Sequence, residues 1–515
     1  MPAIHAKISR VRVVGAGVMG SGIAQLFAGA GINVEITDVV PAALAVATER
    51  IRTQFAREVS KNRMTKADAD AAYARVTTLP DPYMPGSLDL VIEVVKEDLD
   101  IKRQVLSKLE SIISPTTILA SNTSSFSITS IGAALADPSR FAGLHFFNPA
   151  PLMRVVEVIP GQHTTDGVTN RLSGLINSIG HRPVIAADSP GFVINHAGRG
   201  LVTEGLQLLE EGVATPSEID DVARDMLNLR LGPFELMDLT GLDVTHPVME
   251  SIWSGFYGDP RLRPSPLSRL RVDAGLLGRK NGAGFYNYEN GKKTEHFIAG
   301  APRYTGQVLW TEDPLLASRL RSADVHLAKD PVGADAILLA PWGISTLDAA
   351  LAAGLNPALV CGVDPLAKFE GRLAVAIHPG VSPAAGRAAL SALTATGQPV
   401  TLTRDAPATV AQRLLAAVVN TAAEIAQRRI ALPRDIDAAV ELGLGYPQGP
   451  LAWGDKVGAR RILEVLQAMH HGTGDPRYRP SRWLTERVGC ATPLQNAGIS
   501  PQDLSVLQAE AVNNG

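Results

Sequence analysis

The stretch that decides the fold is Arg10-Val-Arg-Val-Val14, followed directly by Gly15-Ala-Gly-Val-Met-Gly20 and then by a helical composition from Ser21 to Ala30. The β-branched run is typical of a buried parallel strand. In the G-x-G-x-x-G motif, the first glycine permits a tight turn, the second lets the backbone approach a pyrophosphate, and the third lets helix and strand pack closely. The stretch predicts a dinucleotide site rather than a plain structural turn, formed by Gly15, Gly17, Val18, Met19 and Gly20.

Asp38 indicates which dinucleotide is bound. It ends a second expected strand, Ile32 to Thr37, at about the spacing of the acid that binds the ribose hydroxyls. A carboxylate there accepts hydrogen bonds from the hydroxyls and repels a 2′-phosphate, and Thr37 and Val39 supply no cation to reverse this preference. We therefore expect NAD rather than NADP.

Strands and helices alternate on both sides of this unit. We expect one long helix from Ala42 to about Arg75, and the further strands are Leu88 to Val95, Ile118 to Ala120, Ala142 to Phe147, Val155 to Ile159 and Pro183 to Ala186. This alternation predicts an α/β fold, a doubly wound Rossmann domain over residues 1–187.

A helical segment of the chain occurs twice. Leu231-Gly-Pro-Phe-Glu-Leu-Met-Asp238 returns as Gln448-Gly-Pro-Leu-Ala-Trp-Gly-Asp455, and Asp220 has a counterpart in Asp437. Matched Gly, Pro and Asp at matched spacing indicate duplication. We predict a first helical domain at 188–292, a degenerate α/β domain without a glycine motif at 300–404, a second, structural helical domain at 405–490, and a tail at 491–515.

Bulk composition excludes several classes of protein. The 515 residues suggest three or four domains, and the net charge of −3 argues against a nucleic-acid partner. Two cysteines cannot form a disulfide framework, which fits a reducing compartment. Neither a secretory signal nor a membrane-spanning stretch is evident. We expect a cytoplasmic protein without a metal.

His145 and Glu157 form the candidate catalytic pair. Each lies in an apolar strand, with a proline-containing turn between the two strands. A buried carboxylate without a partner is costly, and pairing with the imidazole would both remove that cost and raise the basicity of a general base. The alternative is a histidine that only packs in the core.

Two polar segments are candidates for binding the reacting group. Ser121-Asn-Thr-Ser-Ser125 follows a strand at the carboxyl edge of the sheet, where ligands bind, although it could equally cap a helix before Ile128. Asn195 falls in the first turns of the first helical domain, where its amide could polarise a carbonyl or brace the helix. The second copy has Gln412 at this position.

Taken together, these motifs resemble the 3-hydroxyacyl-CoA dehydrogenases of β-oxidation, over about residues 10 to 290. The resemblance is carried by Gly15 to Gln25, Ser121 to Ser125, His145-Phe-Phe-Asn-Pro149, Val156-Glu-Val158, Pro190-Gly-Phe192, Gly232-Pro-Phe-Glu-Leu236 and Gly278-Arg-Lys280. It implies NAD-dependent oxidation of an (S)-3-hydroxyacyl-CoA to a 3-ketoacyl-CoA. The tandem helical domain is typical of longer bacterial members, including those of phenylacetate degradation, and 3-hydroxyadipyl-CoA or 3-hydroxybutyryl-CoA is then the expected substrate.

The resemblance also implies a role for individual residues. His145 and Glu157 are the base pair, and Ser124 and Asn195 contact the reacting oxygen. Glu97, Lys102 and Lys280 belong to the cofactor side. Arg57 and Lys61 hold the CoA phosphates, unless they form a solvated basic face, and Asn148 supports the strand of His145 and the substrate side.

One departure from the family pattern concerns the acyl pocket. The family usually has Tyr or His and then Pro shortly before Gly-Pro-Phe-Glu, whereas Leu229-Arg-Leu231 stands here and Tyr446-Pro447 is kept in the second copy. Arg230 is therefore a candidate partner for a distal carboxylate of the substrate. Two rival readings are a dehydrogenase of free hydroxy acids or sugar acids, and a non-catalytic relative of the fold. The chain is expected either to form a homodimer or to be a monomer whose two helical domains form an internal pseudo-dimer.

Overall fold

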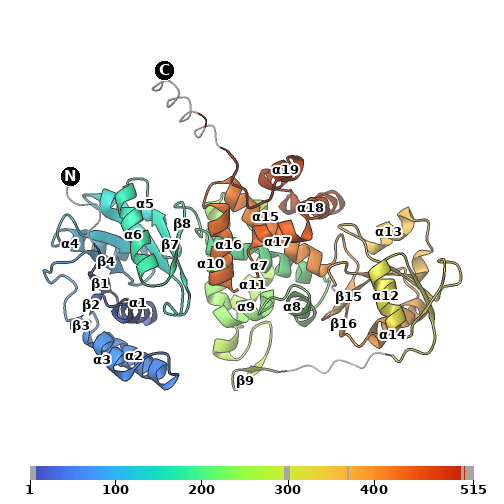
Figure 1. Ribbon diagram of the computed structural model, residues 1–515, viewed down its shortest axis with the longest axis horizontal. Helices are drawn as coiled ribbons and strands as arrows, with labels where there is room; N and C mark the ends of the chain where they lie inside the picture. Colours follow the sequence, from blue (N-terminus) through green and yellow to red (C-terminus); the bar gives the residue numbers. More distant parts are fainter. Residues whose placement is uncertain (1–6, 295–301, 368–370, 500–503, 505–515) are drawn as a thin grey trace. The chain divides into compact units, whose positions relative to one another are not determined.

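The computed structural model describes residues 7–294, 302–367, 371–499 and 504. Figure 1 shows the order of the elements along the chain. They form two compact units, of which the first comprises Met1–Gly300, Arg429–Ala431 and Ala438–Pro447 and the second the remainder. The extreme N-terminus, where no secretory signal was expected, and most of the predicted tail lie outside the described residues.

An eight-stranded sheet organises the first part of the chain, in the order β3-β2-β1-β4-β5-β6-β7-β8. All neighbouring strands run parallel except β6 and β7, which are antiparallel. The strands are β1 (Arg10–Val14), β2 (Asn33–Thr37), β3 (Val76–Leu79), β4 (Leu90–Glu93), β5 (Ile118–Ser121), β6 (Phe141–Phe146), β7 (Val155–Pro160) and β8 (Arg182–Ile185). The predicted doubly wound Rossmann architecture is confirmed.

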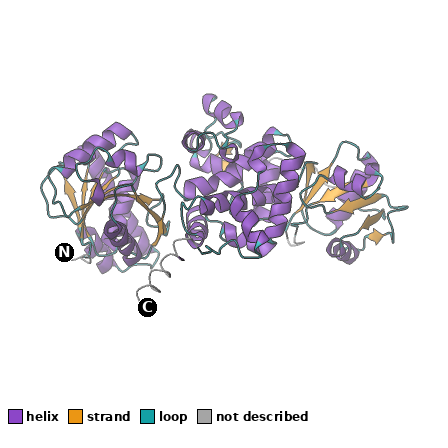
Figure 2. Cartoon of the chain, turned by 90° about the horizontal axis from the view of Figure 1, so that it is seen from above, coloured by secondary structure: helices purple, strands orange, loops and turns teal. Residues whose placement is uncertain are grey.

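Helices cover both faces of this sheet (Figure 2). They are α1 (Val18–Gly29), α2 (Pro41–Ser60), α3 (Lys66–Ala74), α4 (Leu99–Glu110), α5 (Ile128–Gly132) and α6 (Asp166–Ser178). The single helix expected from Ala42 to Arg75 was wrong, because Thr65 starts a new helix by accepting a hydrogen bond from the Asp68 N–H. Strand β3 was not predicted, since its four residues are half exposed and carry no apolar run.

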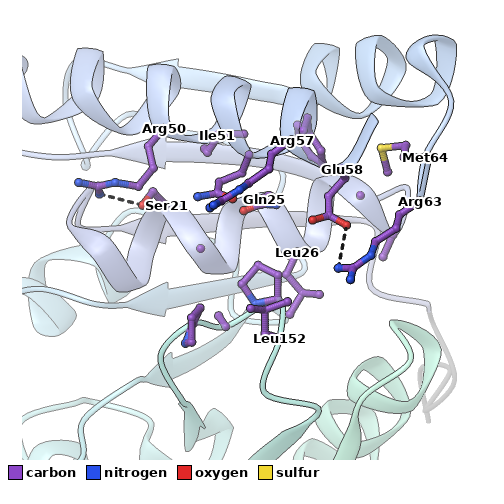
Figure 3. A pocket seen from close by; sticks show the side chains of 18 of the residues that line it. Ser21, Gln25, Leu26, Arg50, Ile51, Arg57, Glu58, Arg63, Met64 and Leu152 are labelled. Carbon is purple, nitrogen blue, oxygen red and sulfur yellow. Dashed lines mark hydrogen bonds and ion pairs between the residues drawn. The ribbon is translucent and has the colours of Figure 1, made fainter. Parts of the chain in front are cut away.

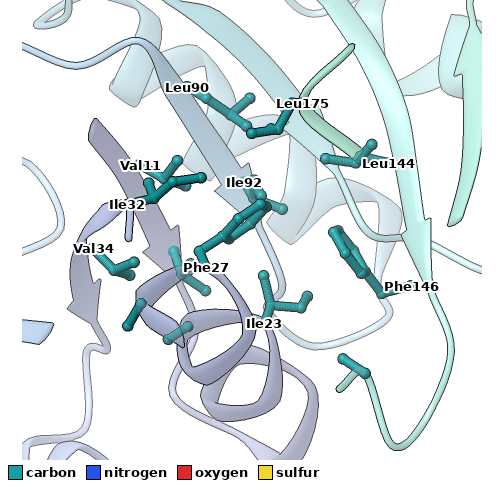
Figure 4. Close-up of a cluster of buried hydrophobic side chains, with 14 of the residues drawn as sticks. Val11, Ile23, Phe27, Ile32, Val34, Leu90, Ile92, Leu144, Phe146 and Leu175 are labelled. Atoms are coloured by element: carbon teal, nitrogen blue, oxygen red, sulfur yellow. The ribbon is translucent and has the colours of Figure 1, made fainter. Parts of the chain in front are cut away.

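The core beneath α1 fixes the glycine turn against the sheet. Phe27 of α1 packs edge-on against Phe146 of β6, with ring centroids 5.9 Å apart. Ile23 on the same helix face and Ile92 of β4 are completely buried beside this pair (Figure 4). The strand before the glycines and the helix after them are thereby held in one position.

Beyond β8 the chain becomes helical, as predicted. The helices are α7 (Ile194–Glu210), α8 (Pro216–Asp225), α9 (Pro233–Thr240), α10 (Leu242–Gly255) and α11 (Pro266–Asp273), followed by the short strands β9 (Tyr288–Glu289) and β10 (Lys292–Lys293). Thr215 caps α8 through a capping box with Glu218.

A six-stranded sheet in the order β12-β11-β13-β14-β15-β16 follows. Its strands are β11 (Val308–Thr311), β12 (His326–Leu327), β13 (Ala336–Leu339), β14 (Val360–Val363), β15 (Leu373–Ile377) and β16 (Val400–Arg404). Its helices are α12 (Pro314–Ser322), α13 (Thr346–Ala352) and α14 (Pro383–Ala395). β14 and β15 are antiparallel and β15 and β16 parallel, which repeats the arrangement of β6, β7 and β8.

The last helices are α15 (Val410–Gln427), α16 (Pro433–Leu444), α17 (Pro450–Val457), α18 (Ala459–Thr473) and α19 (Arg482–Gly489). Short 3-10 turns occur at η1 (Pro138–Arg140), η2 (Pro260–Leu262), η3 (Arg279–Asn281), η4 (Pro357–Leu359) and η5 (Pro476–Tyr478). Within the described residues, no helix is long and apolar enough to cross a membrane. Cys361 and Cys490 are both free.

The predicted duplication is visible in equivalent hydrogen bonds. Asp220 accepts from the backbone N–H groups of Phe234 and Glu235, at 3.0 and 2.9 Å. Asp437 accepts in the same way from Leu451 and Ala452, at 2.8 and 3.1 Å, so one carboxylate anchors α9 and its counterpart anchors α17.

The repeat extends into the α/β segments. Asp188 accepts from the N–H groups of Ile128 and Thr129 in α5. Asp405 accepts from those of Thr346 and Leu347 in α13. The region between the helical domains therefore repeats the strand arrangement and the aspartate contact of the second half of the Rossmann domain.

Candidate functional site

The glycine turn has the geometry that its sequence predicted. Gly15 has φ 118°, and a Cβ atom there would lie 2.5 Å from the carbonyl oxygen of Val94. A Cβ on Gly20 would lie 1.9 Å from the carbonyl oxygen of Gly15, whereas one on Gly17 would meet nothing within 4 Å. Close packing thus requires glycine at the first and third positions. The second glycine borders open space, where a ligand can approach the backbone.

The Asp38 side chain connects the glycine turn to the end of β2. Its carboxylate accepts from the N–H groups of Ala16 at 2.7 Å and Val40 at 2.9 Å. Helix α1 starts at Gly17 without a side-chain cap, so its positive N-terminal end is available to an anion. A pyrophosphate at the helix and ribose hydroxyls at the carboxylate fit this arrangement, which therefore suits NAD.

A buried ion cluster lies behind the next loop. The Lys102 ammonium lies 2.8 Å from Glu93 and 3.0 Å from Glu97, and the Lys102 side chain is only 1% exposed. Glu93 also accepts from the Ser121 hydroxyl at 2.6 Å. Sequence reasoning missed Glu93, although an acid ending an apolar strand opposite a buried lysine is a signal that could have identified it.

Glu97 organises the polar loop Ser121–Ser125. One oxygen accepts from the Thr123 hydroxyl, the Ser125 hydroxyl and the N–H of Ser124. Burial alone would raise the pKa of Glu97, but the Lys102 charge and the hydroxyl donors outweigh burial and hold that pKa below its usual range. The cap of α5 is Ser127, which leaves the Ser124 hydroxyl free of a capping role.

His145 and Glu157 face each other across the antiparallel pair β6 and β7, where they are register partners. Nδ1 of His145 lies 2.7 Å from Oε2 of Glu157, and both side chains are buried. The rings of Phe147 and Phe192 lie 4.3 and 5.8 Å from the imidazole ring. The contact expected from the sequence is therefore present, in an apolar setting that strengthens it.

The other oxygen of Glu157 reaches the first helical domain. Oε1 accepts from the N–H groups of Val193 at 2.8 Å and Ile194 at 3.0 Å, at the start of α7. One carboxylate thus connects the imidazole of β6 to the helix that carries Asn195. Sequence reasoning did not predict this link, because the two segments are far apart in the chain.

Of the two asparagines named from the sequence, Asn148 differs in its placement from expectation. The Asn195 side chain makes no hydrogen bond with the described residues, so its amide remains available to a ligand. Asn148 was expected to support the strand of His145, but it is exposed and makes no hydrogen bond with the described residues. That support comes instead from Asn122, whose side-chain oxygen accepts from the Phe146 N–H at 2.8 Å.

A basic pocket lies between α1, α2 and the loop after β6 (Figure 3). Its volume is about 850 Å³, and its lining includes Arg57, Lys61, Val18 and Asn148. The structure thus brings together four residues predicted for the cofactor and substrate sides. Arg50 and Arg63 add two cations to the wall that sequence reasoning missed.

Lys280 does not join these residues. Its ammonium forms an ion pair with Asp243 in the first turn of α10. Nothing among the described residues ties it to the glycine turn.

The second copy has neither the histidine nor the glutamate of the candidate catalytic pair. Aligning β14 and β15 with β6 and β7 puts Asp364 at the position of His145 and Ala374 at that of Glu157. Asp364 accepts from the Thr409 hydroxyl and the Ala411 N–H, and so holds the start of α15 as Glu157 holds the start of α7. The anchoring role is kept and the imidazole is gone.

Comparisons with known proteins agree with this division. Residues 10–189 match the family model for the NAD binding domain of 3-hydroxyacyl-CoA dehydrogenase. Residues 191–288 and again 410–494 match the C-terminal domain of that family. Both helical domains therefore match the same model, and only the first follows a matched cofactor domain.

Relatives of two lengths are similar to the chain. A 3-hydroxyadipyl-CoA dehydrogenase of Escherichia coli is 33% identical, over 93% of this chain and 98% of the relative. A probable 3-hydroxybutyryl-CoA dehydrogenase of Bacillus subtilis is 40% identical, over 55% of this chain and 98% of the relative. The crystal structure of an Escherichia coli 3-hydroxybutyryl-CoA dehydrogenase superimposes with a TM-score of 0.84 at 33% identity, covering 94% of this chain and 99% of the other.

Proposed function

The chain belongs to the 3-hydroxyacyl-CoA dehydrogenase family, and we propose that it oxidises the (S)-3-hydroxyl group of an acyl-CoA to a ketone through the His145–Glu157 pair. The observation that supports this most is the 2.7 Å contact between these side chains at the junction of β6, β7 and α7. NAD, when bound, supplies the acceptor for the hydride that leaves C3.

The glycine turn and Asp38 hold the cofactor. The first N–H groups of α1, from Val18 to Gly20, would donate to the pyrophosphate at the uncapped start of that helix, and the Asp38 carboxylate would accept from the ribose hydroxyls. The ion cluster of Glu93, Glu97 and Lys102 keeps the adjoining loop in place on the cofactor side.

His145 removes the hydroxyl proton. Glu157 accepts from Nδ1–H, which fixes the tautomer and leaves Nε2 as the base towards the substrate. As the proton arrives at Nε2, the neighbouring carboxylate stabilises the imidazolium. The reverse reaction returns the proton from Nε2 to the forming hydroxyl.

Ser124 and Asn195 position the reacting oxygen. Ser124 is held by its N–H bond to Glu97 at 3.1 Å, and Asn195 by the anchoring of α7 on Glu157. Both side chains can donate to an oxygen that becomes a carbonyl, while the base accepts its proton.

The CoA moiety fits the basic pocket. Arg57 and Lys61 on the exposed side of α2 would bind its phosphates, with Asn148 opposite them on the loop after β6. This pocket favours a CoA thioester over a free hydroxy acid, which would leave these cations without a ligand.

Residues from the second helical domain belong to the same compact unit as the first. Ile430 accepts from the Ala187 N–H at 2.7 Å, and the end of α16 packs on α7. These contacts support an internal pseudo-dimer rather than a homodimer through α7. Location in a reducing cytoplasm is part of the same proposal, in line with the two free cysteines.

The test compares purified protein on (S)-3-hydroxybutyryl-CoA and on free (S)-3-hydroxybutyrate, followed by NADH absorbance. We expect turnover of the thioester with a higher kcat/KM than that of the free acid. Faster turnover of the free acid would reject the CoA assignment, and no NADH with a panel of 3-hydroxyacyl-CoA thioesters would reject the dehydrogenase itself.

A further inference from the structure

Phe192, shortly before α7, has a backbone conformation that bulky residues rarely adopt. Its φ is 47°, and the preceding Gly191 has φ 74°, so two consecutive residues lie in the left-handed region. Glycine reaches this region without cost, whereas the Cβ of any other residue is crowded there by its own backbone. The Phe192 side chain is nevertheless packed inside the protein and is only 1% exposed. A strained residue that persists in a packed interior indicates a function for its side chain.

The Phe192 ring packs against the imidazole of the candidate base. Its centroid lies 5.8 Å from that of His145, and the two ring planes are inclined by 60°. The Phe147 ring lies 4.3 Å from the same imidazole, inclined by 56°. Centroid separations of about this size are typical of aromatic pairs in contact. The imidazole therefore contacts two aromatic rings, one directly after β6 and one before α7.

The second copy of this segment provides an internal comparison. Thr409 stands at the position of Phe192 with φ −79°, although Ala408 before it keeps a left-handed φ of 60°. The carboxylate of Asp364 still accepts from the N–H of Ala411 there, so the helix is anchored without an aromatic ring. The strained aromatic residue is thus missing from the copy that has no imidazole, and anchoring of the helix does not require it.

The left-handed turn brings one short segment to both members of the catalytic pair. The N–H groups of the two residues after Phe192, Val193 and Ile194, donate to Oε1 of Glu157 at 2.8 and 3.0 Å. Because the chain turns sharply before these donors, the Phe192 ring contacts the imidazole while the N–H groups that follow it reach the carboxylate.

We propose that Phe192 is a positioning residue for His145, whose ring keeps the imidazole in the orientation in which Nδ1 donates to Glu157 and Nε2 faces the substrate. This inference rests on the proposed function. The second side-chain torsion of histidine has broad minima, so the hydrogen bond to Glu157 alone leaves the ring free to tilt. An aromatic ring packed against the imidazole removes that freedom, and a base already held in the reactive geometry lowers the barrier to proton transfer.

The experiment follows a single turnover of acetoacetyl-CoA by stopped-flow loss of NADH absorbance, with the enzyme–NADH complex in excess. The rate constant is measured at rising enzyme concentration until it reaches a plateau. This plateau reports the steps up to hydride transfer and does not depend on the fraction of the preparation that is misfolded. Phe192→Leu, which keeps apolar bulk but no ring, should lower the plateau about 10- to 100-fold, the range expected when a catalytic group is displaced by about 1 Å.

Phe234→Leu is the matched control. Phe234 is also completely buried and its ring lies 4.7 Å from that of Phe285, but it belongs to α9 and not to the segment beside the imidazole. This variant should lose a comparable aromatic contact and leave the plateau within about twofold of the wild type. Both variants should keep the dissociation constant of NADH within about twofold, as measured by fluorescence titration.

A wild-type plateau in Phe192→Leu would overturn the assignment, and so would an equal decrease in Phe234→Leu, because the effect would then be a general consequence of a lost core contact. If Phe192→Leu does not fold, Phe192→Met takes its place with the same expectation, since its unbranched side chain adapts to the same volume. Inactivity of the wild type on 3-ketoacyl-CoA thioesters would reject the proposed function itself. An active wild type with an unaffected Phe192 variant would reject only the role of Phe192.

Discussion

At the scale of single residues, Glu157 is engaged on both of its oxygens. One holds the imidazole of His145, and the other anchors the first turn of α7. Replacing either member of the pair should stop the chemistry, and the loss of the acid should weaken the fold more, because it also removes the acceptor for the first turn of α7.

His145→Gln and Glu157→Gln form a matched pair that separates these two roles. We expect either change to lower kcat by at least about 100-fold, since a positioned base contributes that much or more. Glu157→Gln should in addition lower the free energy of unfolding by about 1–3 kcal/mol, because its single amide oxygen cannot accept from both His145 and α7. Both variants should bind NAD as the wild type does, as measured by fluorescence titration. Wild-type turnover of His145→Gln would reject its role as base.

The stability of the protein should depend on pH through the titration of Asp220. Burial raises the pKa of Asp220 to about 7, against the Tyr286 hydroxyl and backbone donors that lower it. In the unfolded chain the group titrates near about 4. The folded state therefore binds a proton that the unfolded state releases, and the stabilisation by the protonated carboxyl is complete below about pH 4 and is lost as the pH rises through 7.

Urea unfolding of the wild type and of Asp220→Asn, at several values between about pH 5 and 8, tests this sign. The free energy of unfolding of the wild type, minus that of the variant, should decrease as the pH rises. A difference that increases over this range would show that Asp220 is ionised in the folded protein.

The sequence indicated some of these residues better than others. His145 and Glu157 could be paired because a short turn joins their strands and each side chain interrupts an apolar run. Asn122 and Glu93 could not, since their roles depend on which distant backbone or side chain lies opposite them. Periodicity identifies a face of an element, but not the partner of that face.

At the scale of elements, each helical domain joins two helices by a glycine packed on an aspartate. A Cβ on Gly232 would lie 2.4 Å from the Cα of Asp220, and one on Gly449 would lie 2.2 Å from the Cβ of Asp437. The same close approach in both copies explains why these glycines and aspartates match between the two copies of the repeat.

Gly232→Ala should therefore be strongly destabilising. The new methyl group would meet backbone that cannot rotate away, and we expect a loss of about 2–4 kcal/mol in the free energy of unfolding. Gly174→Ala, in α6, is the control, because a Cβ there meets nothing within 4 Å. It should be neutral or slightly stabilising. Equal melting temperatures of the two variants would contradict the packing described for Gly232.

Element boundaries were less predictable than element types. The predicted strands lie close to where they were expected, because apolar β-branched runs identify buried strands well. The break between α2 and α3 was missed, since Thr65 lies in a continuous polar pattern and only its cap reveals it. Half-exposed β3 was missed for lack of an apolar run.

At the scale of the whole molecule, the chain has two α/β regions, and only the first has a glycine motif and the His145–Glu157 pair. In the second, β11 is followed by Asp313, whose carboxylate accepts from the N–H groups of Leu315 and Leu316 at the start of α12. In the first half, Asp98 caps α4 in the same way, so α12 corresponds to α4 and not to α1, and the described residues of the second half contain no counterpart of the glycine turn.

We therefore predict one NAD per chain. Calorimetric titration of the intact protein should give a stoichiometry near one, and Gly17→Asp should abolish that binding, because a carboxylate there would repel the pyrophosphate. Two equivalent sites per chain would contradict the assignment of the second half as a degenerate copy.

The packing of Gly443 and Leu444 on α7 limits how the chain could be shortened. A fragment that ends near residue 292, the length of the shorter relatives, would uncover Ile194 and Gly198 together. Such a fragment would expose apolar surface at the helix that carries Asn195. The second helical domain thus covers α7 of the first, although it has no catalytic imidazole of its own.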